Sequence, residues 1–301
     1  MLPVTVIGGY LGAGKTTLVN HLLRQADGQK LAVLVNEFGA LPIDEDLIEA
    51  QDDTMISIAG GCVCCSYGND LVQAMIELTN LEQKPDHILI ESSGVAMPGA
   101  IASSVSIIAG LHVDGIVVVA DAETIREQAG NDYIGDTIER QLSDADLVLL
   151  NKCDLVGSDR LERVQSWLGS TATNATIVRV HHAKVPNAVV LQRFDRVDIA
   201  GPQDFHPHAD VFETCVIPFE KEVDAKVVAQ QLAHPDLNLV RAKGFVPTPN
   251  GMFAIHTVGR RWSVSNAPAK APSGVVVIAE ALNSRISSLV GLFEDQTDST
   301  S

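Results

Sequence analysis

The sequence has 301 residues, of which 46% are hydrophobic, and its formal charge is -17. A chain of this length can bury a full core, which suggests one large domain and a smaller one. Because acidic residues are in excess and no run of Lys or Arg occurs, we expect neither nucleic acid nor an anionic membrane as a partner. Proteins and small molecules fit better as partners.

The sequence favours a cytoplasmic protein. Its first residues, MLPVTVIGGYLG, lack the basic region of a signal peptide. No apolar run reaches the roughly 18 residues that a membrane-spanning helix needs. Five cysteines, three of them nearly adjacent, make a poor disulfide framework, and a reducing compartment would keep them free for metal or redox chemistry.

Short apolar runs alternate with longer amphipathic stretches over the first two thirds of the chain. Such runs are typical of strands that helices cover on both faces, so we expect an α/β fold with a doubly wound, mostly parallel sheet. The predicted strands are residues 4–8, 31–36, 87–91, 115–121, 147–151 and 176–180.

The last third predicts a smaller α+β domain. We assign residues 1–192 to the first domain and the polar residues 193–210, which include two prolines, to a linker. Residues 211–292 then form the second domain, with a helix near residues 222–234 among several strands. The tail, residues 293–301, should be disordered.

A phosphate-binding loop follows the first predicted strand, because GGYLGAGKTT satisfies the pattern G-x-x-x-x-G-K-[ST]. Its glycines let backbone N–H groups turn toward a phosphate, and the next helix presents its positive end to the same anion. Lys15 would bridge the terminal phosphates and the Thr16 hydroxyl would ligate Mg²⁺. All fixed positions match in the right context, which disfavours a chance glycine turn. The expected nucleotide contacts are Gly9, Gly12, Ala13, Gly14, Lys15, Thr16 and Thr17.

Two further segments complete the predicted nucleotide site. Glu91 ends a strand and can hold Mg²⁺ through its water shell, and the Gly94 N–H can sense a γ-phosphate. Asn151, Lys152 and Asp154 follow another strand in LVLLNKCD. The Asp154 carboxylate can accept two hydrogen bonds from guanine, while the Lys152 stem lies over the purine. Alternatively, this segment is a polar turn with Asp154 as a helix N-cap.

Three thiols in GGCVCCS predict a soft metal site. Cys62, Cys64 and Cys65 suit Zn²⁺ or another late divalent ion such as Co²⁺. The alternatives are buried structural cysteines and a redox pair. Glu37, water or a partner's side chain could supply a fourth ligand.

The motifs GGYLGAGKTT, VNEFG, GGCVCC, ESSGVAMP and NKCD occur in the order and with roughly the spacing of the CobW-like GTPases. Together with LVRAKGFV near the C-terminus, the chain resembles that family over about residues 2–290. The resemblance implies a Mg²⁺-dependent GTPase that delivers zinc or cobalt to client metalloproteins. One departure is NEFGALPIDED, where Pro42 and Asp44 precede Glu45, whereas some relatives carry a nearer second glutamate that helps to bind metal.

Our functional hypothesis from the sequence is a GTP-gated metallochaperone with slow intrinsic turnover. GTP would order the segments around Glu37 to Asp44 and Glu91 to Gly94, and hydrolysis would release the metal. Lys15, Glu91 and Asp44 are the catalytic candidates, with Asp44 orienting the attacking water. The alternatives are a GTP-dependent zinc-sensing module and a P-loop kinase of small molecules. Homo-oligomerisation stays open.

Overall fold

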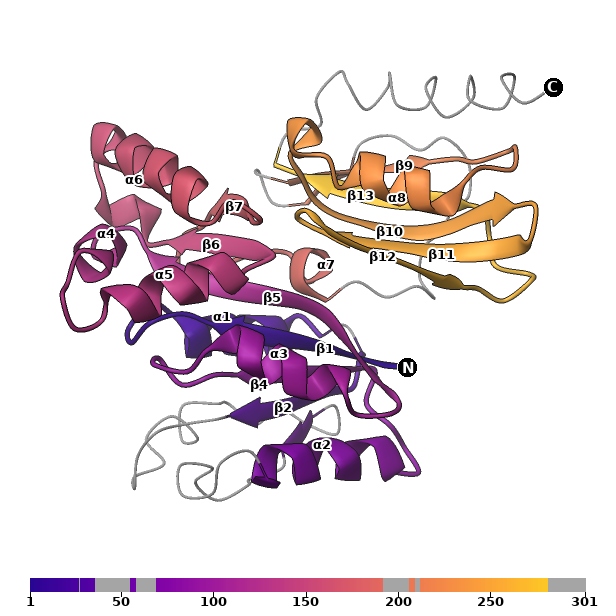
Figure 1. Cartoon of the computed structure of the whole chain (residues 1–301), viewed down its shortest axis with the longest axis horizontal. Helices are drawn as coiled ribbons and strands as arrows, with labels where there is room; N and C mark the ends of the chain where they lie inside the picture. Colours follow the sequence, from indigo (N-terminus) through magenta and orange to yellow (C-terminus); the bar gives the residue numbers. More distant parts are fainter. Residues whose placement is uncertain (27, 36–54, 58–68, 192–205, 209–211, 281–301) are drawn as a thin grey trace. The chain divides into compact units, whose positions relative to one another are not determined.

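The computed structural model describes residues 1–26, 28–35, 55–57, 69–191, 206–208 and 212–280 (Figure 1). It divides into two compact units, Met1–Leu191 and Gln192–Ser301. Within the described part of the chain, no helix is both long and apolar enough to span a membrane.

The first unit is built on a sheet of seven strands in the order β3-β2-β4-β1-β5-β6-β7, and every pair is parallel. This confirms the predicted doubly wound α/β fold. The strands are β1 (Leu2–Gly8), β2 (Leu31–Val35), β3 (Met55–Ser57), β4 (His87–Glu91), β5 (Leu111–Asp121), β6 (Leu147–Asn151) and β7 (Thr176–Arg179).

Helices cover the sheet, as parallel strands that are apolar along their length require. The helices are α1 (Lys15–Arg24), α2 (Asn69–Asn80), α3 (Pro98–Ser106), α4 (Ile125–Ala129), α5 (Gly135–Asp144), α6 (Ser158–Thr171) and α7 (Asn187–Val190). Alternate strand residues such as Val6 and Ile90 join one core cluster with apolar residues of α2, α3, α5 and α6. The residues between them, such as Ile7 and Leu89, are also fully buried.

The order of the strands reverses direction at β1. From this central strand the chain first builds β2, β3 and β4 on one side, and then β5, β6 and β7 on the other. The register places Ile7 beside Glu91, and Asp121 beside Asn151. Since ligands of such sheets bind at the carboxyl ends of the strands near the reversal, this edge is the expected site.

The second unit is a six-stranded sheet in the order β12-β11-β10-β13-β9-β8, with antiparallel pairing and helix α8 packed on it. This confirms the smaller α+β domain. Its elements are β8 (His206–His208), β9 (Phe212–Ile217), α8 (Ala225–Leu232), β10 (Leu239–Thr248), β11 (Gly251–Val258), β12 (Arg261–Asn266) and β13 (Gly274–Ala279). Its core includes Val228 and Leu232 of α8 against Val246, Ile255 and Val277.

Strand β8 lies inside residues 193–210, which the sequence predicts as a linker. It is an edge strand that pairs antiparallel with β9, with Pro207 opposite Glu213. Proline is tolerated at a sheet edge, where one side of the strand needs no ladder hydrogen bond. Pairing with β9 therefore makes this segment a strand, and its polar sequence pattern alone does not predict one.

Candidate nucleotide-binding site

The loop between β1 and α1 depends on glycine at three positions. The φ angles of Gly9, Gly12 and Gly14 are 130, 76 and 109°, in the region that L-residues rarely adopt. A Cβ on Gly9 would lie 2.2 Å from the Val119 carbonyl oxygen, and one on Gly14 would lie 2.5 Å from Asn151 Nδ2. The loop is thus a tight backbone cradle packed against β5 and β6.

Helix α1 presents an uncapped N-terminus to this cradle. No side chain caps it, and its first turn carries no acidic residue. Helix α8 differs, since the Asp224 carboxylate accepts hydrogen bonds from the Lys226 and Val227 amides. An uncapped, positively polarised helix end beside a glycine loop favours a bound anion. Lys15 is 8% exposed, and its Nζ donates to the Tyr10 carbonyl oxygen of the same loop at 3.4 Å.

Thr16 and Glu91 meet beside the loop. The Thr16 hydroxyl donates to Glu91 Oε1 at 2.7 Å, and Glu91 is only 3% exposed. The parallel register of β1 and β4 brings these residues together, although 75 positions separate them. A buried carboxylate and a hydroxyl are oxygen donors of the kind that Mg²⁺ prefers near phosphates, so the residues present fit this ion.

Gly94 packs directly against the phosphate loop. A Cβ on Gly94 would lie 2.6 Å from the Leu11 side chain and 2.8 Å from its backbone nitrogen. The backbone on either side is held by Gln141 of α5, whose Nε2 donates to the carbonyl oxygens of Gly94 and Ala96 at 3.0 and 2.8 Å. The turn after Glu91 is therefore tied both to the loop and to α5.

Asn151 joins two backbone segments at the end of β6. Its Nδ2 donates to the Ala13 carbonyl oxygen at 2.9 Å, and its Oδ1 accepts from the Ala183 amide at 2.8 Å. The side chain is 2% exposed and connects the phosphate loop with the segment that follows β7. Asn151 consequently positions both segments through one amide group.

Lys152 and Asp154 lie at the exposed end of the same strand. Lys152 has a φ angle of 60°, and its Nζ donates to Asp121 Oδ2 at 2.6 Å. The other oxygen of Asp121 accepts from the Glu123 amide at 2.8 Å, which orients the carboxylate. Asp154 is exposed, and its Oδ1 lies 3.3 Å from His181 Nδ1. Its carboxylate is available to a ligand from solvent.

The alternative role of Asp154 as a helix N-cap is wrong. Asp154 lies inside a short 3-10 helix, Cys153–Leu155, whose N-cap is Lys152. Helix α6 begins later, at Ser158 after Gly157, and no side chain caps it.

Residues 181–186 complete the rim of the site. His182 and Ala183 adopt positive φ angles of 53 and 52°, which turns the Ala183 amide toward Asn151. His21 of α1 supports this segment, because its Nε2 lies 2.9 Å from the Val185 oxygen and accepts from the Val185 amide at 3.2 Å. Burial lowers the pKa of His21, and the nearby cations of Lys184 and Arg24 add to this effect.

Family comparisons agree with this geometry. Residues 3–179 match the CobW/HypB/UreG nucleotide-binding domain, and residues 212–291 match the C-terminal domain of the cobalamin synthesis protein CobW. The chain belongs to the CobW/HypB/UreG family. It is 30% identical over 304 residues to the zinc chaperone CobW of Sinorhizobium sp, with 86% of each chain covered.

In sequence, other CobW/HypB/UreG relatives are matched over shorter lengths. The zinc chaperone YjiA of Escherichia coli K12 is 33% identical over 192 residues, which span 61% of this chain and 59% of YjiA. The crystal structure of Zn(II)-bound YjiA GTPase from E. coli is 23% identical, with 97% of this chain and 98% of that chain covered and a TM-score of 0.45.

Five predicted site residues of this family member lie outside the described residues. Glu37, Cys62, Cys64 and Cys65 are the predicted transition-metal ligands, and Asp44 is the residue predicted to orient the attacking water. Among the residues that the structure does describe, no group of three His, Cys, Asp or Glu side chains could hold a metal ion. The thiolate site and its fourth ligand therefore stay predictions from sequence.

Sequence reasoning missed Asp121, Gln141 and His21, which support the motif residues. Asp121 ends a predicted strand just as Glu91 does, so the same strand-end argument would have singled it out. Gln141 is 1% exposed and lies on the buried face of α5 with Ile138 and Leu142. A polar residue on an apolar helix face was the available signal for Gln141, whereas His21 carries no comparable pattern.

Proposed function

We propose that this protein hydrolyses GTP and delivers zinc, or a similar transition metal, to client metalloproteins. One observation carries the nucleotide part: the glycine loop, the Thr16–Glu91 pair and the Asn151–Asp154 segment converge on one edge of one sheet. The metal part is supported by the cysteine motif and by relatives that are named zinc chaperones. A relative in Dictyostelium discoideum, 32% identical over 230 residues, is named zinc-regulated GTPase metalloprotein activator 1.

The phosphate end of the site would be served by Lys15 and the N-terminus of α1. Lys15 Nζ is held beside the loop by the Tyr10 carbonyl, where it can neutralise charge on the β- and γ-phosphates. Thr16 and Glu91 would hold Mg²⁺, which supplies further neutralisation of the phosphate charge when it is bound. The Gly94 amide would sense the γ-phosphate, and Asp44 would orient the attacking water.

Guanine selectivity would come from Asp154. An exposed carboxylate at the end of β6 can accept hydrogen bonds from guanine N1–H and its amino group, which adenine cannot offer as a pair. Asp154→Asn should weaken GTP binding by about 10- to 100-fold, since a charge-assisted pair is worth roughly 1.5–3 kcal/mol. Xanthosine triphosphate should bind the variant better than the wild type. Unchanged GTP affinity without this gain would reject the assignment.

The metal cargo would be held by Cys62, Cys64 and Cys65. Thiolates are soft ligands that select late divalent ions, and serine cannot replace them because its hydroxyl keeps its proton at neutral pH. If GTP binding and metal binding favour the same state of the protein, each tightens the other by the same factor. Hydrolysis of GTP would then weaken the thiolate site and release the metal to a client.

Cobalt titration tests this proposal. The full-length protein is titrated with Co²⁺ in the presence of Mg²⁺ and either a non-hydrolysable GTP analogue or GDP. We expect an intense thiolate charge-transfer band that is stronger with the GTP analogue and lost when any of the three cysteines is changed to serine. Cys153→Ser is the matched control, because Cys153 is buried in the first unit and its Sγ donates to the Leu150 carbonyl.

Two results of the titration would contradict the proposal. A band of equal intensity with the GTP analogue and with GDP would show that GTP binding and metal binding are not coupled. A band that persists in the variant with all three serines would place the metal site elsewhere.

A zinc-sensing regulatory module is the second candidate, and it is favoured by the relative in Dictyostelium discoideum that is named a zinc-regulated GTPase metalloprotein activator. In that case bound zinc controls GTP hydrolysis, and the protein keeps its metal. Chelator competition during a single turnover of GTP separates the two functions. Release of metal to a chromophoric chelator on hydrolysis supports the chaperone, whereas retention supports the sensor.

A further inference from the structure

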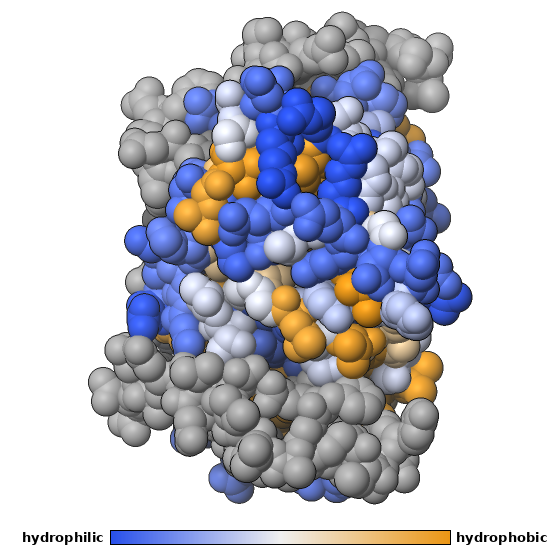
Figure 2. Space-filling view, turned by 90° about the vertical axis from the view of Figure 1, so that its left-hand side faces the viewer, coloured by the Kyte–Doolittle hydropathy of each residue, from blue (hydrophilic) through white to orange (hydrophobic). Residues whose placement is uncertain are grey.

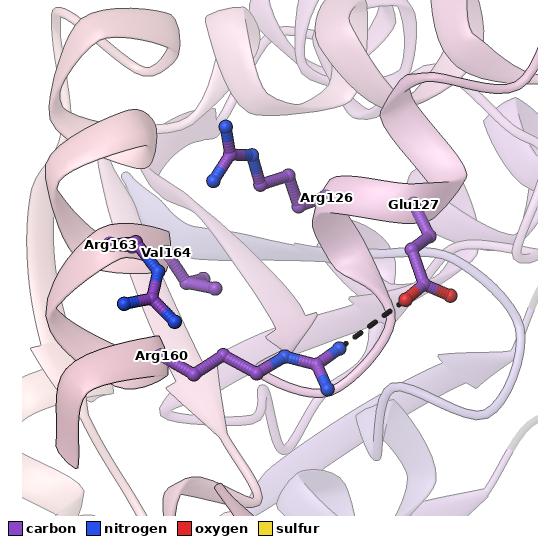
Figure 3. Close-up of a pocket in the computed structure, with 5 residues that line it drawn as sticks. All are labelled: Arg126, Glu127, Arg160, Arg163 and Val164. Carbon is purple, nitrogen blue, oxygen red and sulfur yellow. Dashed lines mark hydrogen bonds and ion pairs between the residues drawn. The ribbon is translucent and has the colours of Figure 1, made fainter. Parts of the chain in front are cut away.

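A cavity of about 410 Å³ lies between helices α4 and α6 of the first unit. Arg126 and Glu127 line it from α4, and Arg160, Arg163 and Val164 line it from α6 (Figure 3). Arg126 and Arg163 extend toward the same space from these two helices, and Arg160 lies below them in the view of Figure 3. None of these residues belongs to the phosphate or base motifs.

The charge of this pocket is opposite to that of the chain. Three of the 21 lysines and arginines line it with a single glutamate, whereas the whole chain carries a formal charge of -17. Two positive charges thus remain after the pocket's own carboxylate is counted. Salt largely screens exposed charges that lie more than about one Debye length away, roughly 8 Å at physiological salt, so an anionic ligand would be attracted here although the chain as a whole is acidic.

The pocket already holds one carboxylate of the chain itself. Arg160 Nη2 donates to the Glu123 carbonyl oxygen and lies 3.4 Å from Glu127 Oε1. The Glu127 side chain is 80% exposed, so this pair sits in water and a competing carboxylate can replace Glu127 at little cost. The backbone contact with Glu123 keeps Arg160 in place during such an exchange.

The other two guanidinium groups have no acidic partner among the residues that the structure describes. Arg126 and Arg163 are exposed, and their side chains make no hydrogen bond or ion pair with any described residue. A guanidinium presents a planar fork of N–H donors that matches a carboxylate in two parallel hydrogen bonds. Three such forks around one cavity can receive several carboxylates together.

We propose that this arginine pocket, formed by Arg126, Arg160 and Arg163, docks an acidic segment of a partner protein. The Glu127–Arg160 contact shows that the pocket accepts a side-chain carboxylate. Nucleic acid fits less well, because a long polyanion would extend beyond the pocket along a chain whose formal charge is -17. The face drawn in Figure 2 carries hydrophilic and hydrophobic areas side by side. The proposal depends on neither the nucleotide nor the metal.

Fluorescence anisotropy with the full-length protein tests this docking site. The probe is a short fluorescein-labelled peptide of alternating glutamate and glycine, and a peptide with glutamine in place of glutamate is its control. The acidic peptide should bind, and its affinity should fall severalfold as salt is raised from about 50 to 200 mM. The glutamine peptide should not bind. No binding of the acidic peptide at low salt would overturn the proposal.

Variants locate the binding on the protein. The double change Arg126→Gln and Arg163→Gln should weaken peptide binding by about tenfold or more, the effect expected for lost charge-assisted hydrogen bonds. Arg140→Gln is the matched control, because Arg140 is also exposed but lies on α5 outside the pocket. If Arg140→Gln weakened peptide binding equally, the effect would come from the overall charge of the protein, and the site would be refuted.

A variant that binds the peptide more tightly is also needed, because weaker binding alone could result from unfolding of the variant. Glu127→Gln removes the carboxylate that competes for Arg160 and should tighten the acidic peptide severalfold. Weaker or unchanged binding would count against the pocket. Inorganic phosphate is the last arm of the experiment: if it displaces the peptide at the peptide's own concentration, the site is one for small free anions and the docking proposal fails.

Discussion

Replacing Asn151 with alanine tests how the nucleotide site is held together. The change removes the hydrogen bond to the Ala13 carbonyl and the one from the Ala183 amide, at 2.9 and 2.8 Å. Ala13 and Ala183 are 2% and 0% exposed, so water cannot readily replace the lost partner. Each buried group left unsatisfied costs about 1–3 kcal/mol. After partial relaxation we expect about 2–4 kcal/mol of lost stability in the first unit.

Tryptophan fluorescence can follow this unit by itself. The chain has two tryptophans, Trp167 on α6 in the first unit and Trp262 on β12 in the second. In a Trp262→Phe background, thermal unfolding of the Trp167 signal should shift down by about 4–16 °C for Asn151→Ala, since 1 kcal/mol corresponds to roughly 2–4 °C in a unit of this size. Nucleotide affinity should fall as well, because Asn151 no longer connects the phosphate loop with the segment that follows β7.

An exposed asparagine provides the matched control. Asn131 Oδ1 also accepts two backbone hydrogen bonds, from Tyr133 and Ile134 at 2.9 and 3.3 Å, but water can replace it. Asn131→Ala should therefore cost under about 1 kcal/mol. If the two variants were equally stable, burial of the Asn151 amide would not be the cause of its effect.

Three further changes test the backbone, a histidine and a thiol. Gly9→Ala should abolish nucleotide binding in calorimetry, because its Cβ would lie 2.2 Å from the Val119 oxygen, whereas Gly12→Ala should do less damage since no atom lies within 4 Å. His21→Gln should reduce the amount by which stability against urea falls below about pH 6.5. The folded state lowers the His21 pKa, so the neutral side chain stabilises the fold at higher pH. This contribution is lost in acid, where His21 is protonated more readily in the unfolded chain than in the folded one. Cys215, whose pKa burial raises from 9.0 to about 11, should be alkylated about 100-fold more slowly at pH 8 than in urea, and equal rates in mass spectrometry would contradict its burial.

Strands covered on both faces were the most predictable part of this fold. The runs at residues 87–91 and 147–151 are strands over the same residues in the structure, because each is apolar almost throughout. Strand β5 begins at Leu111 rather than at residue 115. Its first residues include His112 and Asp114, and a polar residue such as Asp114 is buried only because other segments of the fold surround it. No local pattern reveals such surroundings.

The candidate site was predictable where a motif has several fixed positions. Gly9 to Thr16, Glu91 with Gly94, and Asn151 to Asp154 all lie at the edge of the sheet that their strand-end positions indicate. Single supporting residues were not predictable in this way. Gln141 reaches Gly94 across 47 positions of sequence, and His21 reaches Val185 across 164. Such contacts depend on how helices pack over the sheet.

The reversal of strand order at β1 divides the work of the site between two stretches of the chain. Everything that would touch phosphate is encoded before α3 ends, and everything that would read a base is encoded after β5 begins. With Asp154 reading the base as proposed, a substitution there would change the base preference without changing the phosphate half. During synthesis the phosphate half emerges first, with β1 as an open sheet edge until β5 pairs with it. The residues proposed to select the base would therefore be the last part of the site to leave the ribosome.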